Sequence, residues 1–186
     1  MGTRNIFNSN YHFVTSWRIP GTVDEVNAVL REPLNLPQWW PAVYMDAKEL
    51  KPGDANGVGR EIALYTKGWL PYTLQWRFTI TNTDPRRLEW DAFGDFVGRG
   101  KWEFEQVGAD VVATVDWEIR AAKPLLRYLT PLMRPVFAAN HHWAMRTGEK
   151  SLRVELLRNR GVDPARLPTP PQPTFARWAA HRSIDA

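Results

Sequence analysis

Hydrophobic and polar residues alternate over much of the chain, with the period of two that is typical of strands with one buried face. Between residues 72 and 83, for example, Leu74, Trp76 and Phe78 share one face while the residues between them are polar. The pattern predicts strands over seven segments: 11–19, 44–50, 60–67, 72–83, 87–93, 96–104 and 111–120. From residue 44 onward, short segments rich in turn-forming residues separate them. Because strands joined by short turns must be antiparallel, we expect one antiparallel sheet with a solvated outer face.

Two helical segments are expected between the first two strands. Thr22 and Glu25 have the spacing of a capping box, in which side chains and backbone N–H groups at a helix start satisfy each other. Pro33 ends this first helix. The short segment 36–44 contains two tryptophans between two prolines, and we interpret it as a second helical turn rather than a strand.

The longest helical pattern runs from residue 124 to 159, directly after the last strand. Because an interior proline removes a backbone hydrogen bond, we expect a short helix to about Thr130, a break or kink, and then a long helix to about Asn159. The apolar line of the long helix is interrupted by Asn140 and Gly148. A glycine there costs about 1 kcal/mol relative to alanine, so it predicts close backbone approach to the sheet or to a ligand. A partly polar cover over an apolar sheet face indicates a pocket.

Composition adds further constraints. The 186 residues include ten tryptophans, far above ordinary usage, which suits a thick core or a wide cavity wall. The absence of cysteine excludes disulfides and thiolate chemistry. The net charge of +4 comes from 24 basic and 20 acidic residues that are interleaved along the chain, as expected for a mixed solvated surface.

The two ends of the chain differ from the middle. The segment 161–186 is rich in proline and is expected to be irregular, with Phe175 and Trp178 tethering it to the domain. The first ten residues show no apolar targeting segment, and no stretch reaches bilayer-spanning length. We therefore expect a cytoplasmic protein without an integral membrane segment.

The order of elements, together with four short strings, resembles a known superfamily. The strings are LPQWWP at 36–41, TKGWLPY at 66–72, GDFVGRG at 94–100 and NHHWAM at 140–145, the last followed by Gly148 and Glu149. The chain is similar to START-like (SRPBCC, Bet v 1-like) proteins, in particular to a bacterial subgroup described as polyketide cyclase/dehydrase-like. This resemblance covers roughly residues 11–158.

The resemblance implies an α+β helix-grip fold. In that fold a curved antiparallel sheet of about seven strands wraps a long C-terminal helix, and two short helices follow the first strand. We expect a START-like domain over 1–160 and a proline-rich tail over 161–186. The superfamily includes lipid carriers, receptors, cyclases and chaperone co-activators, so fold alone does not define activity.

The implied function is binding of a hydrophobic or aromatic small molecule, or a lipid, between the sheet and the long helix. Asn140 and His141 would orient a polar group of the ligand, and the other expected contacts are largely aromatic. The full predicted set is Trp39, Trp40, Thr66, Trp76, Trp90, Phe96, Trp102, Trp117, Phe137, Asn140, His141 and Ala144. Simpler alternatives are that the tryptophans form a solid core, that Asn140 ties a neighbouring backbone group, and that His141 is a satisfied, partly exposed histidine.

Two other function classes stay open. One is an enzyme of the cyclase/dehydratase kind, in which His141 is the candidate proton-transfer residue. The other is a partner-binding module of the chaperone co-activator kind. The enzyme hypothesis lacks a convergent acid–base set, because Asp91, Asp116 and Glu118 fall on polar strand faces and no serine lies on a nucleophile elbow.

Several site types are not expected. No metal is predicted, because adjacent histidines diverge on a helix and His142 lies ~10 Å along the axis from Glu149. No cofactor is predicted, since the glycines at 94–100 lie within a hairpin and not between a strand and a helix. No nucleic-acid partner is predicted, because the tryptophans lie on the dry face of the sheet.

Overall fold

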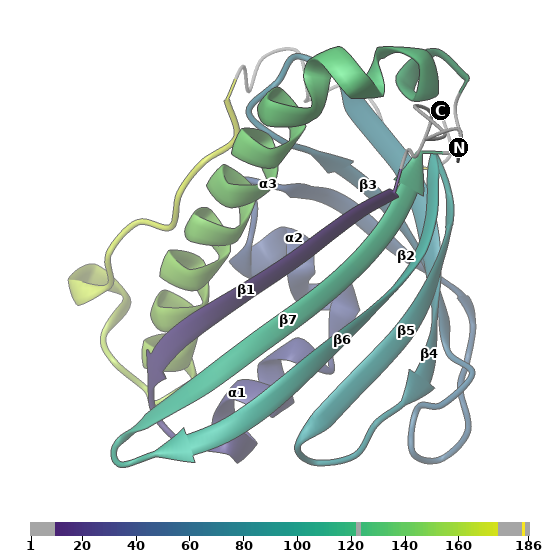
Figure 1. Ribbon diagram of the computed structural model, residues 1–186. Coiled ribbons are helices and arrows are strands. Elements are labelled where there is room, and N and C mark those ends of the chain that lie inside the picture. The colour runs from purple at the N-terminus through teal and green to yellow at the C-terminus, as the bar shows by residue number, and fades with distance from the viewer. Residues whose placement is uncertain (1–9, 122–123, 175–183, 185–186) are drawn as a thin grey trace.

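The computed structural model describes the backbone of residues 10–121, 124–174 and 184, and the side chains of 11–120, 134–174 and 184. Within this part of the chain one antiparallel sheet runs in the order β1-β7-β6-β5-β4-β3-β2. Its strands are β1 (Asn10–Pro20), β2 (Tyr44–Lys51), β3 (Glu61–Lys67), β4 (Thr73–Asn82), β5 (Arg87–Gly94), β6 (Phe96–Val107) and β7 (Asp110–Ala121). The sheet curls strongly, as Figure 1 shows. The predicted α+β helix-grip fold with seven strands is confirmed.

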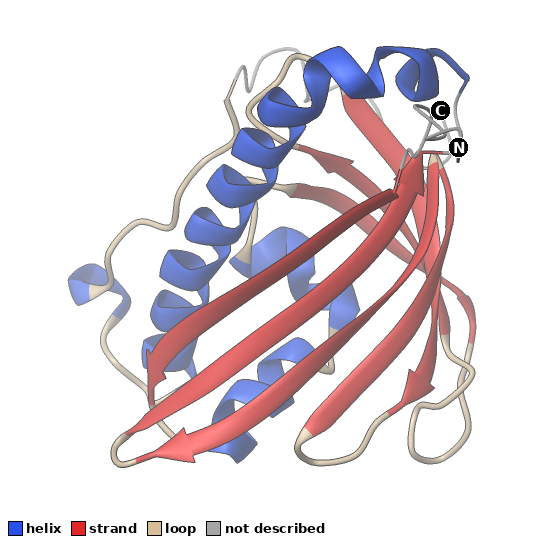
Figure 2. Ribbon diagram, viewed as in Figure 1, coloured by secondary structure: helices blue, strands red, loops and turns tan. Residues whose placement is uncertain are grey.

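The segment between β1 and β2 is helical, as expected. Helix α1 (Val23–Leu30) begins with a complete capping box, in which Thr22 and Glu25 bond each other's backbone N–H groups. A 3₁₀ turn, η1 (Pro33–Asn35), leads into the short α2 (Leu36–Trp39). Figure 2 shows these helices and α3 on the same, concave side of the sheet.

Helix α3 (Pro124–Asn159) is one continuous helix, so of the predicted break or kink the break is absent, while the helix does change direction (Figure 1). A proline inside a helix removes one backbone donor and favours a kink, but the bonds of the neighbouring turns can keep the segment helical. Figure 1 shows the helix changing direction near its upper end and then descending past β1. The lower part of α3 therefore covers the concave face.

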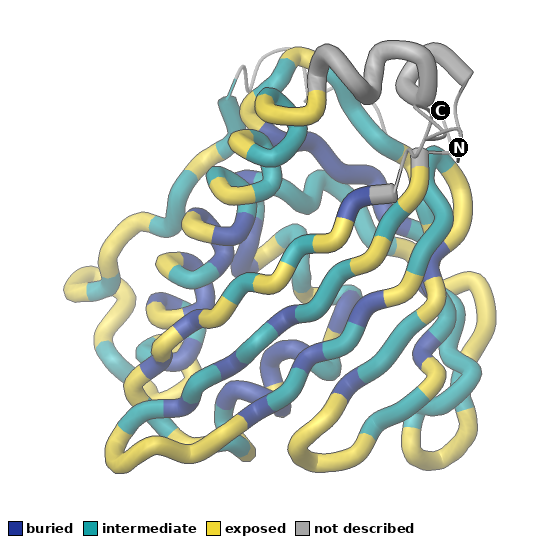
Figure 3. Tube along the Cα trace, viewed as in Figure 1, coloured by how far each residue is buried: buried dark blue, intermediate teal, exposed yellow. Residues whose placement is uncertain are grey.

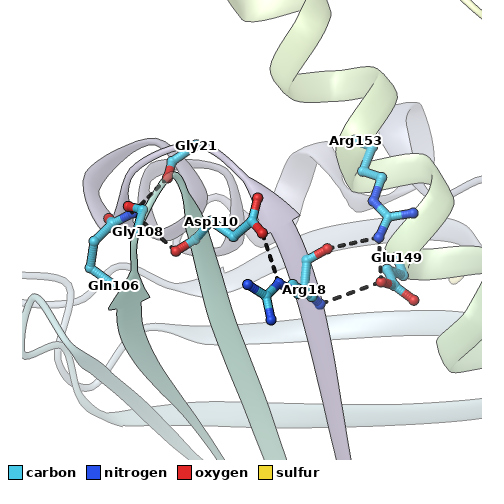
Figure 4. Close-up of polar contacts among 7 residues, drawn as sticks. All are labelled: Arg18, Gly21, Gln106, Gly108, Asp110, Glu149 and Arg153. Carbon is cyan, nitrogen blue, oxygen red and sulfur yellow. Dashed lines mark hydrogen bonds and ion pairs between the residues drawn. The ribbon is translucent and has the colours of Figure 1, made fainter.

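Polar side chains fasten α3 to β1, which is an edge strand of the sheet. Arg153 donates to the backbone oxygen of Arg18 (2.7 Å) and to Glu149 Oε1 (2.7 Å), and the same Glu149 oxygen accepts from the Arg18 N–H at 3.4 Å. The Arg18 side chain binds Asp110 on β7 (2.7 Å), as Figure 4 shows. Edge strands expose unpaired backbone groups, and here side chains of α3 bind them.

The adjacent β6–β7 turn is fixed by one amide. Gln106 Nε2 lies 3.0 Å from three backbone oxygens, those of Gly21, Gly108 and Asp110 (Figure 4). Gly108 has φ +62°, in the left-handed region that favours glycine. This end of the sheet, where β1, β7 and α1 meet, is thereby closed by side-chain contacts.

Burial alternates along the strands, as Figure 3 shows for the front strands. Trp17 and Ile19 of β1 are buried while Ser16 and Arg18 between and beside them are exposed. The outer face carries cross-strand ion pairs, for example Arg87 with Glu103 at 2.9 Å. The predicted division into a dry and a wet face is therefore present in the sheet.

The segment after α3 runs back along the domain. It contains the 3₁₀ turn η2 (Pro164–Arg166). The Thr174 hydroxyl contacts the backbone oxygens of Gly68 (3.4 Å) and Trp69 (3.2 Å), and the Ile184 N–H donates to Asp46 (3.2 Å). The predicted tethers Phe175 and Trp178 lie outside the described residues. The contacts that are described attach the segment to the β3–β4 loop and to β2.

Candidate functional site: a pocket between sheet and helix

A pocket of about 280 Å³ lies between the concave face of the sheet, α3 and the segment around α2. Eleven of the twelve predicted site residues line it: Trp40, Thr66, Trp76, Trp90, Phe96, Trp102, Trp117, Phe137, Asn140, His141 and Ala144. The twelfth, Trp39, lies outside the lining. It is 1% exposed, within the core, with its ring centroid 5.5 Å from that of Trp40. The tryptophans of the sheet therefore surround a space in addition to filling a core.

The sheet side of the pocket is an aromatic wall built from four strands. Trp76, Trp90 and Trp117 come from β4, β5 and β7, with Trp117 5.9 Å from Trp76 and 5.5 Å from Trp90 between ring centroids. Phe96 of β6 completes the wall, 4.9 Å from Trp76. Strand alternation puts every second side chain on the concave face, and these rings occupy such positions.

Gly100 has no side chain, and this leaves room for the rings of the aromatic wall. A Cβ at Gly100 would lie 2.2 Å from a carbon of the Trp90 ring and 2.4 Å from a carbon of the Trp117 ring. Gly100 therefore makes room for Trp90 and Trp117.

Trp40 forms a second wall, where α2 meets α3. Its ring lies 5.5 Å from Trp17 and 5.1 Å from Tyr44, and its Nε1–H donates to Thr147 Oγ1 at 3.1 Å. A Cβ at Gly148 would lie 2.3 Å from this ring. The close approach predicted at Gly148 is present, but its partner is Trp40, not the sheet.

His141 belongs to an aromatic cluster that joins β1, α3 and the β3–β4 loop. Its ring stacks on Phe13 (4.1 Å, 14°), and Phe137 packs edge-on against Tyr11 (6.1 Å) and Tyr72 (6.5 Å). Burial, with the nearby His142 as a smaller cause, lowers the pKa of His141 to about 4. His141 is therefore neutral near pH 7, and Thr15 Oγ1 at 3.5 Å is a weak partner.

Asn140 and Thr66 already have protein partners. Asn140 Oδ1 accepts the backbone N–H of Trp69 at 2.9 Å, and a Cβ at Gly68 would overlap the Asn140 amide. The alternative in which Asn140 ties a neighbouring backbone group is thus confirmed. Thr66 Oγ1 accepts Nε1–H of Trp76 at 3.0 Å, which fixes that ring in the wall.

Three tyrosines that sequence reasoning did not single out also line the pocket: Tyr11, Tyr44 and Tyr72. Burial raises the pKa of Tyr44 above its ordinary value, and burial together with nearby Tyr11 raises the pKa of Tyr72 to about 12. For Tyr11 the signal was available, since it shares a strand face with Trp17. Tyr44 is the first residue of β2 and Tyr72 directly precedes β4, where alternation says little about the direction of a side chain.

Two ionisable residues of opposite charge, Lys67 and Asp95, also line the pocket. Burial lowers the pKa of Lys67. Asp95 Oδ2 accepts the backbone N–H of Gln75 at 3.0 Å, and both residues have further interactions. The two side chains are of opposite formal charge.

Outside the pocket, His12, Asp116 and Glu118 bring ligand-type atoms within 4.8 Å of one another on the outer sheet face. Sequence spacing did not reveal this grouping, because cross-strand pairing creates it. His12 Nε2 is 2.8 Å from Asp116, and Glu118 pairs with Arg99 at 3.1 Å. The hydrogen bond of His12 to Asp116 and the ion pair of Glu118 with Arg99 account for the arrangement.

The curved antiparallel sheet packed on the long helix α3 defines a helix-grip protein. The chain belongs to the family described as polyketide cyclase / dehydrase and lipid transport, whose model matches residues 11–156. Among curated proteins none matches the sequence. In the described part of the chain, no helix combines the length and apolar character needed to cross a membrane.

Solved structures share the fold at low identity. The protein TTHA0849 from Thermus thermophilus aligns with a TM-score of 0.69 at 14% identity, over 80% of this chain and 99% of that one. The Zhui aromatase/cyclase from a Streptomyces species gives 0.64 at 19%, over 86% and 99%. A START superfamily protein from Mycobacterium smegmatis gives 0.58 at 11%, over 80% and 98%. At such identities the likeness shows the fold alone.

Proposed function

We propose that this protein binds an apolar or aromatic small molecule, or a lipid, in the pocket between the sheet and α3. The observation that carries the proposal is the pocket itself, about 280 Å³ with a mostly aromatic and aliphatic lining. Ligand sites in proteins are concave and mostly apolar, with few polar groups that set orientation. The family description, which includes lipid transport and polyketide chemistry, is consistent with this proposal.

Binding is favoured over catalysis by the state of His141. A general acid or base works best with a pKa near the operating pH. Burial lowers the pKa of His141 to about 4, and its nearest described polar partner is a threonine, not a carboxylate. The cyclase/dehydratase alternative rests on the family description and on the place of His141 in the lining.

A pair of alanines on α3 gives a matched test. Ala144 lines the pocket, whereas Ala139 is exposed on the same helix. With N-phenyl-1-naphthylamine as a fluorescent apolar probe, Ala144→Phe is expected to weaken binding at least tenfold, because the added ring fills the space. Ala139→Phe is expected to leave the affinity unchanged. Equal binding by all three proteins, or none by the wild type, would contradict the proposal.

A further inference from the structure

The size of the pocket limits what it can hold. Its volume of about 280 Å³ lies just below the roughly 300–1,000 Å³ that ligand sites span. Both walls resist expansion, since Trp40 packs tightly against Gly148, and Trp90 and Trp117 pack against Gly100. Such a space suits a molecule of two or three fused rings better than one with two acyl chains.

The wall chemistry favours a ring over a chain. Trp76, Trp90, Phe96 and Trp117 surround the space with linked aromatic rings at centroid distances between 4.9 and 5.9 Å. Aromatic pairs in offset or edge-on geometry gain stability beyond the area they bury, and an aliphatic chain cannot supply that interaction. A planar aromatic ligand is therefore the best match to this wall.

The polar groups of the lining favour an uncharged ligand. His141 is neutral near pH 7, and Tyr44 and Tyr72 hold their protons well beyond the ordinary range of tyrosine pKa values. Lys67 and Asp95 are of opposite formal charge, and each already has an interaction within the protein. A charged ligand would lose its hydration without gaining a dedicated counter-charge, which is costly.

Tyr44 supplies a hydrogen-bonding group without a competing partner. It lines the pocket with its ring against Trp40, and burial is the sole cause of its raised pKa. Its hydroxyl makes no hydrogen bond within the part of the chain that the structure describes. Tyr44 is half-buried, and a hydroxyl in the pocket lining that has no protein partner can bind a ligand oxygen.

Resting on the proposed function, we propose that the pocket selects an uncharged ligand of two or three fused rings carrying one hydrogen-bonding oxygen, which the Tyr44 hydroxyl binds. Neither the acyl chain of a lipid nor an anionic ring compound meets all of these conditions.

Four simple probes separate these conditions by isothermal titration calorimetry at pH 7: 2-naphthol, naphthalene, 2-naphthoate and palmitate. A phenol is uncharged at this pH and a carboxylic acid is ionised. The expected order has 2-naphthol tightest, naphthalene a few-fold weaker, and 2-naphthoate and palmitate at least tenfold weaker than 2-naphthol. Palmitate or 2-naphthoate binding as tightly as 2-naphthol would overturn this selection while leaving the proposed function intact. Failure of all four probes to bind would overturn both.

Tyr44→Phe tests the hydroxyl. It is expected to weaken the binding of 2-naphthol about two- to tenfold, through the loss of one neutral hydrogen bond, and to leave the affinity for naphthalene unchanged. Tyr65→Phe is the matched control, because Tyr65 is a buried tyrosine of β3 outside the pocket lining. An unchanged affinity of Tyr44→Phe for 2-naphthol would remove Tyr44 from the site.

Discussion

Replacing Gly148 by alanine perturbs the contact between α3 and the pocket wall. The new Cβ would lie 2.3 to 2.6 Å from three atoms of the Trp40 ring. Relaxed carbon–carbon contacts lie at about 3.5–4.0 Å, so the ring must retreat by roughly 1 Å. Trp40 is 5% exposed and packs between Trp17, Trp39 and Tyr44, which leaves it little room to move.

Two opposing terms set the magnitude. Alanine is the better helix former by about 1 kcal/mol. Overpacking costs about 1–3 kcal/mol, and straining the Trp40–Thr147 hydrogen bond adds about 1 kcal/mol. The net expectation is a loss of about 2 kcal/mol in the free energy of unfolding. For a chain of this size that corresponds to a fall in Tm of roughly 4–8 °C.

Urea unfolding followed by circular dichroism measures this change, and a double-mutant cycle isolates its cause. Phenylalanine at position 40 lacks the outer part of the indole that the new methyl group meets. In the Trp40→Phe background, Gly148→Ala is therefore expected to cost little or to stabilise, with a coupling energy of about 2 kcal/mol. A Gly148→Ala protein that is about 1 kcal/mol more stable than wild type would show that the contact with Trp40 imposes no constraint.

The remaining predictions concern pH and the C-terminal segment. Because folded His141 stays neutral down to about pH 4 while the unfolded histidine protonates near 6.5, stability should fall as pH drops through that window. Between pH 7 and 5, His141→Gln should reduce this loss of stability by up to about 2 kcal/mol. If the free energies of unfolding of wild type and His141→Gln change in parallel with pH, the lowered pKa assigned to His141 is contradicted. Hydrogen bonds from Arg160 and then Thr22 lower the pKa of Glu25 to about 2, so its stabilisation is present above pH 4.5 and is lost as pH falls toward 2. Urea unfolding at pH 6 and 2 should show Glu25→Gln losing about 1 kcal/mol or less at pH 6, after solvent screening, and approaching wild type at pH 2. Thr174→Val should cost about 1 kcal/mol and speed amide exchange in the β3–β4 loop, and unchanged exchange would show that the hydroxyl does not hold the loop.

Much of the fold could be predicted because each local signal had one interpretation. Alternation and short turns specify an antiparallel sheet, and the capping box at Thr22 marks a helix start that the structure reproduces. The continuity of α3 could not be predicted from its prolines. A proline removes one backbone hydrogen bond, but the packing of the whole helix determines whether the helix ends or bends there.

The pocket lining was predictable on strands and less so elsewhere. Period-two geometry places Trp76, Trp90 and Trp117 on the concave face without knowledge of the tertiary structure. Trp39 and Trp40 differ because neighbouring residues on a helical turn point about 100° apart, and only the packed structure shows which one meets the pocket. The partner of Gly148 was also hidden, since Trp40 lies more than a hundred residues earlier in the chain.

The central claim is that the pocket between sheet and α3 holds an apolar or aromatic ligand. Native mass spectrometry of the purified protein tests it most directly, with Ala144→Phe as the blocked variant and Ala139→Phe as its control. We predict that wild type and Ala139→Phe carry the same noncovalently bound organic molecule and that Ala144→Phe does not. An equal amount of the same bound molecule on Ala144→Phe, or wild-type protein that yields no organic molecule on extraction, would contradict the claim.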